Sequence, residues 1–463
     1  MKKISNLNNL LPLYPMLKKH MNIRISKGRC IVYNGRTEDA ALESCQNIVL
    51  LSLCNGRHTL AEITEIYKAV FSTSTAAAKE QAEAVLKSYT EAIKYYETQQ
   101  PERHIFDLSL LKNTATWRYS SLRDEYPGKL TIVLTECCNH ICDYCFKSCD
   151  NSKKQEMEPD DWLRVIDEAH SLGVQEITFT GGEPFLYKDF ISLIAHCTSK
   201  GIYTKISTNG TLLNEDMITR LKNAGAEFIH LSLPSVSEDI YDKITGSTQH
   251  LQKVIRAVRQ LKKNNFYIRV KMVLTPHNTK EVGRLIDFCA EENIDFVHLA
   301  PYILTENSRL GRQLIPDEAE LIRLNSLADQ KRKIHKNIVI SDIPIGSLKW
   351  GGPECIAKCG GIKDSLTILA NGDITLCEAV GELKEFILGN IKKDTLTDIW
   401  NSSKPDDITC PDGKNIDAAC SSCEYLDRCL TGCYAFSHMQ SGNAWSMDPR
   451  CFRFCDTHNI FSD

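Results

Sequence analysis

Three closely spaced cysteines are the first residues in this sequence whose types and spacing can support chemistry. Cys138, Cys142 and Cys145 follow the pattern C-x3-C-x2-C. A loop with this spacing can place three thiolates on three irons of a [4Fe–4S] cube, which leaves the fourth iron open to another molecule. Cys137 is the alternative to Cys138 as a ligand, but only Cys138 lies three residues before Cys142 in the C-x3-C pattern. A structural zinc site is the alternative that spacing leaves open.

A second group of cysteines lies in the last quarter of the chain, where ten of the 20 cysteines fall between Cys355 and Cys455. Zinc accepts four thiolates as readily as an iron–sulfur cluster does, so a pair of zinc ribbons is the alternative here. Either kind of site can stabilise a Gly-, Asp- and Asn-rich segment without long apolar elements. The pattern is Cys359-x12-Gly372-x4-Cys377, followed by Cys420-x2-Cys423-x5-Cys429-x3-Cys433-x17-Cys451.

The rest of the composition is that of an ordinary soluble protein. The chain has 463 residues, of which 42% are hydrophobic and 25% charged, and its net charge is −4. The N-terminus lacks the features of a secretory signal, and no apolar run is long enough to span a membrane. A mildly acidic chain without blocks of Lys and Arg is not expected to bind nucleic acid. We therefore expect a cytoplasmic protein whose clustered cysteines bind metal.

The middle of the chain alternates between strand and helix patterns. This alternation predicts six βα units, forming a parallel sheet that closes into a partial barrel. Ligands of such sheets bind beyond the carboxyl ends of the strands, and the first cysteine motif directly follows the first strand. The predicted strands are 130–134, 176–180, 203–207, 227–233, 267–275 and 296–302, and the predicted helices are 159–172, 188–200, 215–224, 249–263 and 280–292.

Polar motifs also end the next three strands. The second strand ends in Thr180-Gly181-Gly182-Glu183-Pro184, the third in Ser207-Thr208-Asn209-Gly210, and the fourth contains Ser232. Glycines let a backbone approach a ligand closely, and a carboxylate or carbonyl accepts hydrogen bonds from an ammonium group. Lys271 and His298, on the last two strands, can also face this end of the sheet.

Over residues 130–302 these motifs resemble the signature of the radical S-adenosylmethionine (AdoMet) superfamily. The resemblance implies a [4Fe–4S] cluster on Cys138, Cys142 and Cys145 that binds AdoMet and cleaves it to a 5′-deoxyadenosyl radical. It also implies an external electron donor of the flavodoxin or ferredoxin type. The AdoMet-binding residues that it implies are Gly181, Gly182, Glu183 and Pro184 at the amino group, and Ser207, Asn209 and Ser232 at the ribose side. Pro234 stands where the family usually has Asp.

The C-terminal cysteine pattern resembles the SPASM extension of radical AdoMet enzymes that modify peptides. That resemblance implies two auxiliary [4Fe–4S] clusters, and hence three clusters in the whole chain. The first auxiliary cluster is assigned to Cys355, Cys359, Cys377 and Cys433, and the second to Cys420, Cys423, Cys429 and Cys451.

The first hundred residues predict a small winged-helix-like domain. We expect a hairpin at 22–34, a helix at 40–54, and two further helices at 59–71 and 75–96. Residues 47–59 resemble the leader-recognition element of peptide-maturation enzymes, which is similar to the small chaperone of pyrroloquinoline quinone biosynthesis. Such an element binds a precursor's leader by adding a strand to a sheet edge. A purely structural cap is the alternative.

The whole chain is thus expected to be an α/β protein of several domains. These are a leader-recognition domain at 1–105, a linker at 106–128, the radical AdoMet core at 129–305, a bridging segment at 306–349 and the SPASM domain at 350–463.

The resemblances together imply a maturase of a ribosomally made precursor peptide, which it binds through the leader. Its combination of domains most resembles enzymes that form cysteine thioether crosslinks, and carbon–carbon crosslinking is an alternative. Anaerobic sulfatase maturases, which form formylglycine, carry Asp after the cysteine that corresponds to Cys377. Here that residue is Glu378, our candidate catalytic base. A redox- or metal-sensing binding protein is the alternative from another class.

Overall fold

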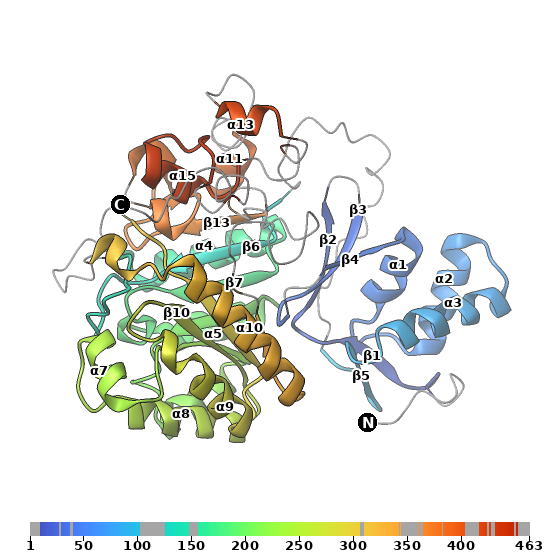
Figure 1. Ribbon diagram of the computed structural model, residues 1–463. Helices are drawn as coiled ribbons and strands as arrows, with labels where there is room; N and C mark the ends of the chain where they lie inside the picture. Colours follow the sequence, from blue (N-terminus) through green and yellow to red (C-terminus); the bar gives the residue numbers. More distant parts are fainter. Residues whose placement is uncertain are drawn as a thin grey trace. The chain divides into compact units, whose positions relative to one another are not determined.

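Figure 1 shows the computed structural model of the chain. It divides into two compact units, one formed by residues up to 128 together with 201–203, and one by the remainder. The structure describes residues 10–26, 29–37, 40–101, 126–147, 156–305, 310–341, 343, 361, 364–381, 383–402, 416–423, 426, 431–448 and 451.

The N-terminal unit combines two small antiparallel sheets with three helices. Strands β2 (Met21–Ser26), β3 (Arg29–Asn34) and β4 (Ala40–Glu43) form one sheet, in that order, and β1 (Tyr14–Leu17) pairs with β5 (Ile93–Tyr96) in the other. The helices are α1 (Cys45–Leu53), α2 (Leu60–Phe71) and α3 (Thr75–Ser88).

The predicted hairpin is confirmed, but two predicted helix bounds are wrong. Residues 40–43 pair with β3, and α1 begins only after Ser44, whose side chain accepts a hydrogen bond from the Asn47 N–H. The residues predicted as one helix from 75 to 96 form α3 and then the separate strand β5. Apolar residues occur in both segments at spacings that suit a helix, so pairing with a neighbouring strand decides the outcome.

The larger unit contains the predicted sheet of alternating strands and helices. Neighbouring strands from β8 to β12 run parallel, as do β6 and β7. The strands are β6 (Lys129–Val133), β7 (Glu176–Thr180), β8 (Tyr203–Thr208), β9 (Phe228–Ser232), β10 (Tyr267–Leu274), β11 (Phe296–Pro301) and β12 (Val339–Ile340).

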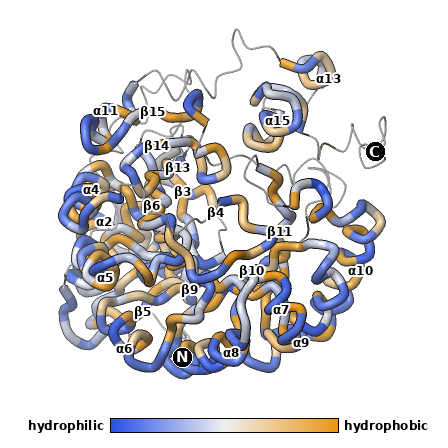
Figure 2. Tube along the Cα trace, turned by 90° about the vertical axis from the view of Figure 1, so that its left-hand side faces the viewer, coloured by the Kyte–Doolittle hydropathy of each residue, from blue (hydrophilic) through white to orange (hydrophobic). Residues whose placement is uncertain are grey.

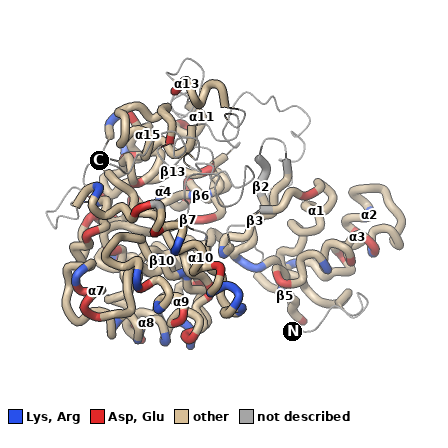
Figure 3. The backbone as a smooth tube through the Cα atoms, in the orientation of Figure 1, with Lys and Arg blue, Asp and Glu red and all other residues tan. Residues whose placement is uncertain are grey.

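Helices connect these strands, and two of them were not predicted. The additional helices are α7 (Glu238–Thr245) and α10 (Glu318–Ile334). Bands of hydrophobic and hydrophilic residues alternate along α8, as expected for an amphipathic helix that covers a sheet (Figure 2). The charged residues of α8 are all basic, whereas α7 and α9 carry charges of both signs (Figure 3). The predicted helices are α4 (Pro159–Leu172), α5 (Phe190–Ser199), α6 (Glu215–Asn223), α8 (Leu251–Lys263) and α9 (Val282–Glu291).

The C-terminal segment continues the barrel sheet with three short strands, an extension that the sequence did not predict. Strand β13 (Ser365–Ile368) pairs in parallel with β6, and β14 (Asp373–Thr375) and β15 (Ile387–Asn390) follow in an antiparallel meander. Gly372 forms the β13–β14 turn with φ +91°. These strands are only three or four residues long, so their alternation is too short to recognise in the sequence.

Short helices complete this segment around buried apolar side chains. They are α11 (Leu396–Asn401), α13 (Ala418–Ser421) and α15 (Tyr434–Ser441). Trp400 and Tyr434 are buried, as is Leu388 on β15. In the described part of the chain, no helix is both long and apolar enough to cross a membrane.

Candidate active site

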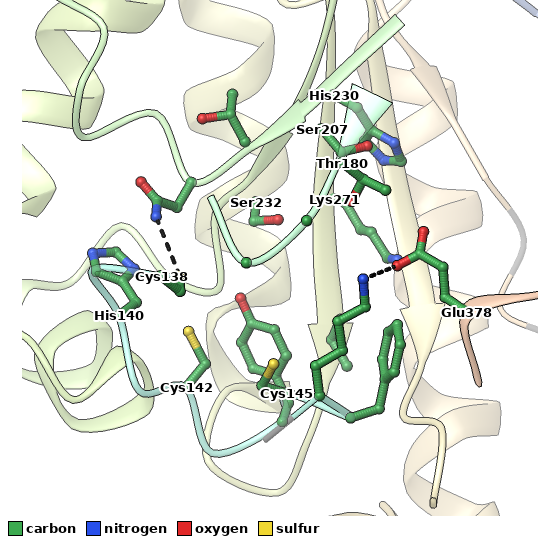
Figure 4. Close-up of a pocket in the computed structure, with 18 of the residues that line it drawn as sticks. Cys138, His140, Cys142, Cys145, Thr180, Ser207, His230, Ser232, Lys271 and Glu378 are labelled. Carbon is green, nitrogen blue, oxygen red and sulfur yellow. Dashed lines mark hydrogen bonds and ion pairs between the residues drawn. The ribbon is translucent and has the colours of Figure 1, made fainter. Parts of the chain in front are cut away.

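A pocket of about 220 Å³ lies at the carboxyl ends of the barrel strands (Figure 4). Its wall contains residues from the first cysteine motif, from the ends of β7 to β10, and from the segment after β14. The described lining residues are Cys138, His140, Cys142, Tyr144, Cys145, Phe146, Lys147, Thr180, Gly181, Gly182, Ser207, Thr208, Asn209, His230, Ser232, Lys271, Val273, Pro301, Ile303 and Glu378.

The three predicted cluster cysteines all line this pocket, and none of them is in a disulfide. Burial raises the pKa of Cys142, and the nearby thiols of Cys145 and Cys138 raise it further. Such mutual repulsion of thiolates is relieved when they bind iron. Cys137 is not among the lining residues, which favours Cys138 as the ligand. Within the described residues, no three Cys, His, Asp or Glu side chains gather closely enough to hold one metal ion.

The two glycines after β7 are required because the backbone of the cysteine loop packs directly on them. The Gly182 N–H donates to the Thr135 carbonyl over 2.7 Å, and the Glu183 N–H donates to the Cys137 carbonyl over 2.8 Å. A Cβ at Gly181 would lie 2.5 Å from the Thr135 carbonyl oxygen, and a Cβ at Gly182 would overlap that of Cys137. Close packing of two protein segments therefore explains both glycines, in addition to any approach of a ligand.

The carboxylate of Glu183 joins two strand ends and does not line the pocket. Glu183 is 1% exposed, and its oxygens accept hydrogen bonds from the Thr208 hydroxyl at 2.7 Å and the Asn209 N–H at 2.8 Å. Pro184, which is buried, follows it as the first residue of a 3-10 turn. In this arrangement the side chain positions the Gly181–Gly182 turn.

Glu183 gives the fold a specific dependence on pH. Burial raises its pKa to about 7. Because the unfolded chain ionises this group at its ordinary, lower pKa, Glu183 makes the folded state less stable as pH rises from about 4.5 to about 7. We expect this contribution to the free energy of unfolding to be on the order of 3 kcal/mol. Thermal unfolding between pH 4.5 and 8 should show a smaller decline for Glu183→Gln than for the wild type. An equal decline of thermal stability with pH in the variant and the wild type would contradict this assignment.

Asn209 connects the third strand to the cysteine loop. Its amide nitrogen donates to Asn139 Oδ1 at 2.8 Å and lies 4.0 Å from Cys138 Sγ. Its amide oxygen accepts from Thr211, whose hydroxyl in turn accepts from Asn139. Asn209 thus orients the first cluster ligand, while Ser207 and Ser232 remain available in the pocket wall.

His140 provides a second anchor for the cysteine loop, which the sequence did not suggest. Its ring stacks on His250, with centroids 5.4 Å apart, and the facing ring nitrogens are 3.2 Å apart. Burial lowers the pKa of His140 to about 4, so the ring is neutral near pH 7. A neutral ring beside the cysteines adds no positive charge to the cluster site.

The late strands contribute Lys271 and His230 to the pocket, while His298 lies outside its described lining. Lys271 is paired in register with Ser232 across β10 and β9. Burial lowers the pKa of Lys271, and the charge of Glu378 opposes that shift. His230 stacks on His298 with centroids 6.0 Å apart, and burial lowers its pKa well below the ordinary value.

Glu378 reaches the pocket from the segment after β14 and forms an ion pair across it. Its Oε2 lies 2.7 Å from Nζ of Lys147, which follows Cys145 by two residues (Figure 4). The residue predicted as a catalytic base therefore lines the same pocket as the cluster cysteines, and a lysine holds it there.

Two family models match the segments that build this pocket. The radical SAM superfamily matches residues 132–289, and the SPASM iron-sulfur cluster-binding domain matches residues 359–424. The chain thus contains a radical SAM domain and a SPASM domain. The observed pocket suits this family because three thiols and a polar strand-end surface face one space.

Similar proteins cover most of the chain. It is 25% identical over 332 residues to the PqqA peptide cyclase of Xanthomonas oryzae pv. oryzae, an alignment that covers 71% of this chain and 88% of that protein. The structure of Streptococcus suis SuiB bound to S-adenosylmethionine matches with a TM-score of 0.69 at 21% identity, covering 94% of this chain and 100% of SuiB. The structure of anSMEcpe with bound AdoMet matches with a TM-score of 0.56 at 20% identity, covering 71% and 91%. The two structures show the shared fold.

The segment that the SPASM model matches, together with the residues after it, places several of the predicted auxiliary ligands in defined positions. Cys377 lies two residues after the end of β14, Cys420 lies in α13 and is buried, and Cys433 caps the start of α15. The predicted auxiliary ligands that the structure describes are Cys377, Cys420, Cys423, Cys433 and Cys451. Cys355, Cys359 and Cys429 lie outside the described residues, so both ligand sets remain predictions.

Asp448 links the segments that carry two of these cysteines, a role that the sequence did not reveal. It is 4% exposed, and its Oδ2 accepts a hydrogen bond from the Cys433 N–H at 2.9 Å. Its carbonyl accepts from the Cys451 N–H at 2.8 Å. Asp448 thus positions one predicted ligand of each auxiliary cluster.

Proposed function

We propose that this radical SAM enzyme modifies a ribosomally synthesised precursor peptide. The observation that carries the proposal is the position of Glu378, which extends the AdoMet-type pocket toward the SPASM domain next to Cys377. Two similar proteins support a peptide substrate. One is named for cyclising PqqA, and SuiB was solved bound to its precursor peptide SuiA.

The residues of the pocket have different roles in such a reaction. When bound, the cluster and AdoMet supply a 5′-deoxyadenosyl radical that removes one hydrogen atom from carbon. Cys138, Cys142 and Cys145 hold the cluster. The Gly181–Gly182 turn, Ser207 and Ser232 hold AdoMet, and an external flavodoxin- or ferredoxin-type donor supplies the electron.

The bond that we propose is a cysteine thioether to a carbon of another residue. Forming it removes one hydrogen atom from that carbon, and one proton and one electron from the thiol; an auxiliary cluster, when bound, would supply the acceptor for that electron. Glu378, in reach of the pocket, is the candidate acceptor of the proton. Carbon–carbon crosslinking is the second candidate, because it uses the same pocket, and formylglycine formation is the third.

Mass spectrometry of the co-expressed precursor tests the proposal. A Cys-rich peptide encoded beside this chain should lose two hydrogens per thioether and have thiols blocked to alkylation. Loss of two hydrogens with free thiols supports carbon–carbon crosslinking instead. Unmodified peptide in the presence of AdoMet, reductant and the loaded enzyme overturns the peptide proposal.

The N-terminal unit has an open sheet edge that suits leader binding. Strand β4 pairs with β3 on one side, and among the described strands none pairs with its other side. Leu42 on β4 is 63% exposed, although most leucines of this unit are buried. An exposed strand edge with an apolar side chain can accept an added strand through main-chain hydrogen bonds and a side-chain contact. We propose β4 as the site of leader binding.

We expect Leu42→Asp to weaken leader binding by on the order of 10-fold, because the apolar contact is lost and a charge is placed in its position. AdoMet cleavage in the absence of peptide should not change. Val70→Asp is the matched control, because Val70 is 58% exposed in the same unit but lies on α2. Fluorescence anisotropy of a labelled leader measures the affinity, and equal loss in both variants would contradict a specific role for β4.

A further inference from the structure

Two cysteines of the N-terminal unit lie against each other. The Sγ atoms of Cys30 and Cys45 are 3.7 Å apart, although the two residues are 15 positions apart in the sequence. Neither lies in the two cysteine groups that resemble cluster sites. Cys54, in the same unit, is buried, and its thiol donates to the Leu50 carbonyl at 3.4 Å. The contact between Cys30 and Cys45 therefore has no part in the chemistry described so far.

The register of strands β3 and β4 explains this contact. Cys30 on β3 is paired with Glu43 on β4, so the two side chains point to the same face of the sheet. Cys45 is the second residue after Glu43 and the first residue of α1. The carboxylate of Glu43 is itself fixed, because it accepts hydrogen bonds from Asn47 at 2.6 Å and from Tyr89 at 2.5 Å. The two thiols thus meet at the anchored end of β4.

The two thiols differ in their access to solvent. Cys30 is 3% exposed, whereas Cys45 is exposed at the start of α1. Burial, together with the hydrogen bond and the charge of Cys45, raises the pKa of Cys30 to about 12. A cysteine reacts with a disulfide as its thiolate, and the disulfide must be able to reach it. An oxidant therefore meets Cys45 first, and Cys30 is placed to react with Cys45 afterwards.

We propose that Cys30 and Cys45 form a thiol–disulfide switch, which a low-molecular-weight disulfide oxidises. The Cys45 thiolate attacks one sulfur of this oxidant, which forms a mixed disulfide and releases one small thiol. Cys30 then attacks the Cys45 sulfur and releases the second small thiol. In each step the released thiolate takes up the proton that the cysteine loses. Two protein thiols and one small disulfide thus give one protein disulfide and two small thiols.

The disulfide ties the end of β4 to β3. It closes a ring over residues 30–45, which contains the whole of β4 (Ala40–Glu43). A covalent ring limits how far the segments that it encloses can separate. The oxidation state of the two cysteines therefore sets how firmly β4 is held in its sheet. This inference goes beyond the proposed function and does not depend on it, although β4 is also the strand to which we assign leader binding.

Peptide mapping of the full-length, cluster-loaded enzyme tests for the bond. The protein is equilibrated without oxygen in mixtures of oxidised and reduced glutathione, alkylated and digested with trypsin. Trypsin places Cys30 in the peptide 30–36, and Cys45, together with Cys54, in the peptide 37–57. We expect the two peptides to be joined after oxidation, with a mass two hydrogens below the sum of the reduced peptides.

Three single variants assign the role of each sulfur. Cys54→Ser is the matched control and should form the joined peptides as the wild type does. Cys45→Ser should lose them, and its Cys30 should stay reduced because it is buried. In Cys30→Ala we expect glutathione to remain on Cys45, because no second thiol displaces it. Absence of the joined peptides from the wild type in the most oxidising mixture, or their presence in Cys45→Ser, overturns the proposal.

Hydrogen exchange measures the effect of the disulfide on β4. Oxidation should slow amide exchange in residues 40–45 by on the order of 10-fold, because local opening of this strand is limited by the closed ring. The same treatment of Cys45→Ser should leave exchange in these residues unchanged. Equal exchange in the oxidised and the reduced wild type, with the joined peptides present, overturns the switch.

Discussion

Replacing Cys142 with alanine should abolish AdoMet cleavage and leave the C-terminal clusters in place. Iron should fall from about 12 to about 8 per chain, since three cubes become two. Cys142 lines the pocket between the two other thiols of its motif, so its loss removes one of three ligands of the first cluster. The described C-terminal cysteines lie in other elements, after β14 and around α13 and α15.

Cys137→Ala is the matched control for this experiment. Cys137 lies in the same loop, but it is not among the described residues that line the pocket. We expect normal iron content and normal formation of 5′-deoxyadenosine by this variant. Zinc at about two per chain and no 5′-deoxyadenosine from the wild type would contradict the cluster assignment altogether.

Gly182→Ala is expected to displace the cysteine loop. The added Cβ would overlap the Cys137 carbonyl oxygen, a backbone atom that cannot move without moving the loop. Overpacking against a fixed backbone costs about 1–3 kcal/mol, and more where nothing can yield. Because the displaced loop carries the cluster ligands, reconstituted iron and AdoMet cleavage should fall together with the melting temperature.

Gly283→Ala separates this effect from a general cost of replacing glycine. Gly283 lies in α9, and a Cβ there would meet only Leu327 and Lys331 side chains at 3.7 and 3.8 Å. Alanine in a helix interior is favoured over glycine by up to about 1 kcal/mol, so this variant should be as stable as the wild type or more so. Normal iron loading in Gly182→Ala would contradict a role of the glycine in positioning the loop.

The sequence predicted the barrel and the location of its pocket because both depend on local patterns. Strand and helix periods placed β7 and α4 at their observed bounds. Because the cysteine loop, the Gly181–Gly182 turn and Asn209 each follow the end of a predicted strand, we could predict that they share one edge of the sheet. These inferences need no long-range information beyond the rule that parallel strands share a carboxyl edge.

The direction of side chains within the site could not be predicted in the same way. Glu183 was expected at the ligand, but it hydrogen-bonds to residues 25 and 26 positions later in the chain. The Lys147–Glu378 ion pair and the hydrogen bond from Cys433 to Asp448 likewise depend on how distant segments meet. No spacing or period in a single sequence encodes such contacts.

The pairing of β13 with β6 has a consequence for how this protein can be divided. The residues matched by the two family models are separate in the sequence, yet Ser365 to Ile368 pair in register with Lys129 to Ile132. A truncation before residue 365 would leave β6, the strand before the cluster cysteines, with unsatisfied main-chain groups along a buried apolar edge. Such an edge recruits strands from other molecules, so we expect a truncated barrel to aggregate. Exchange of SPASM domains between relatives would therefore have to keep β13 with the barrel that it completes.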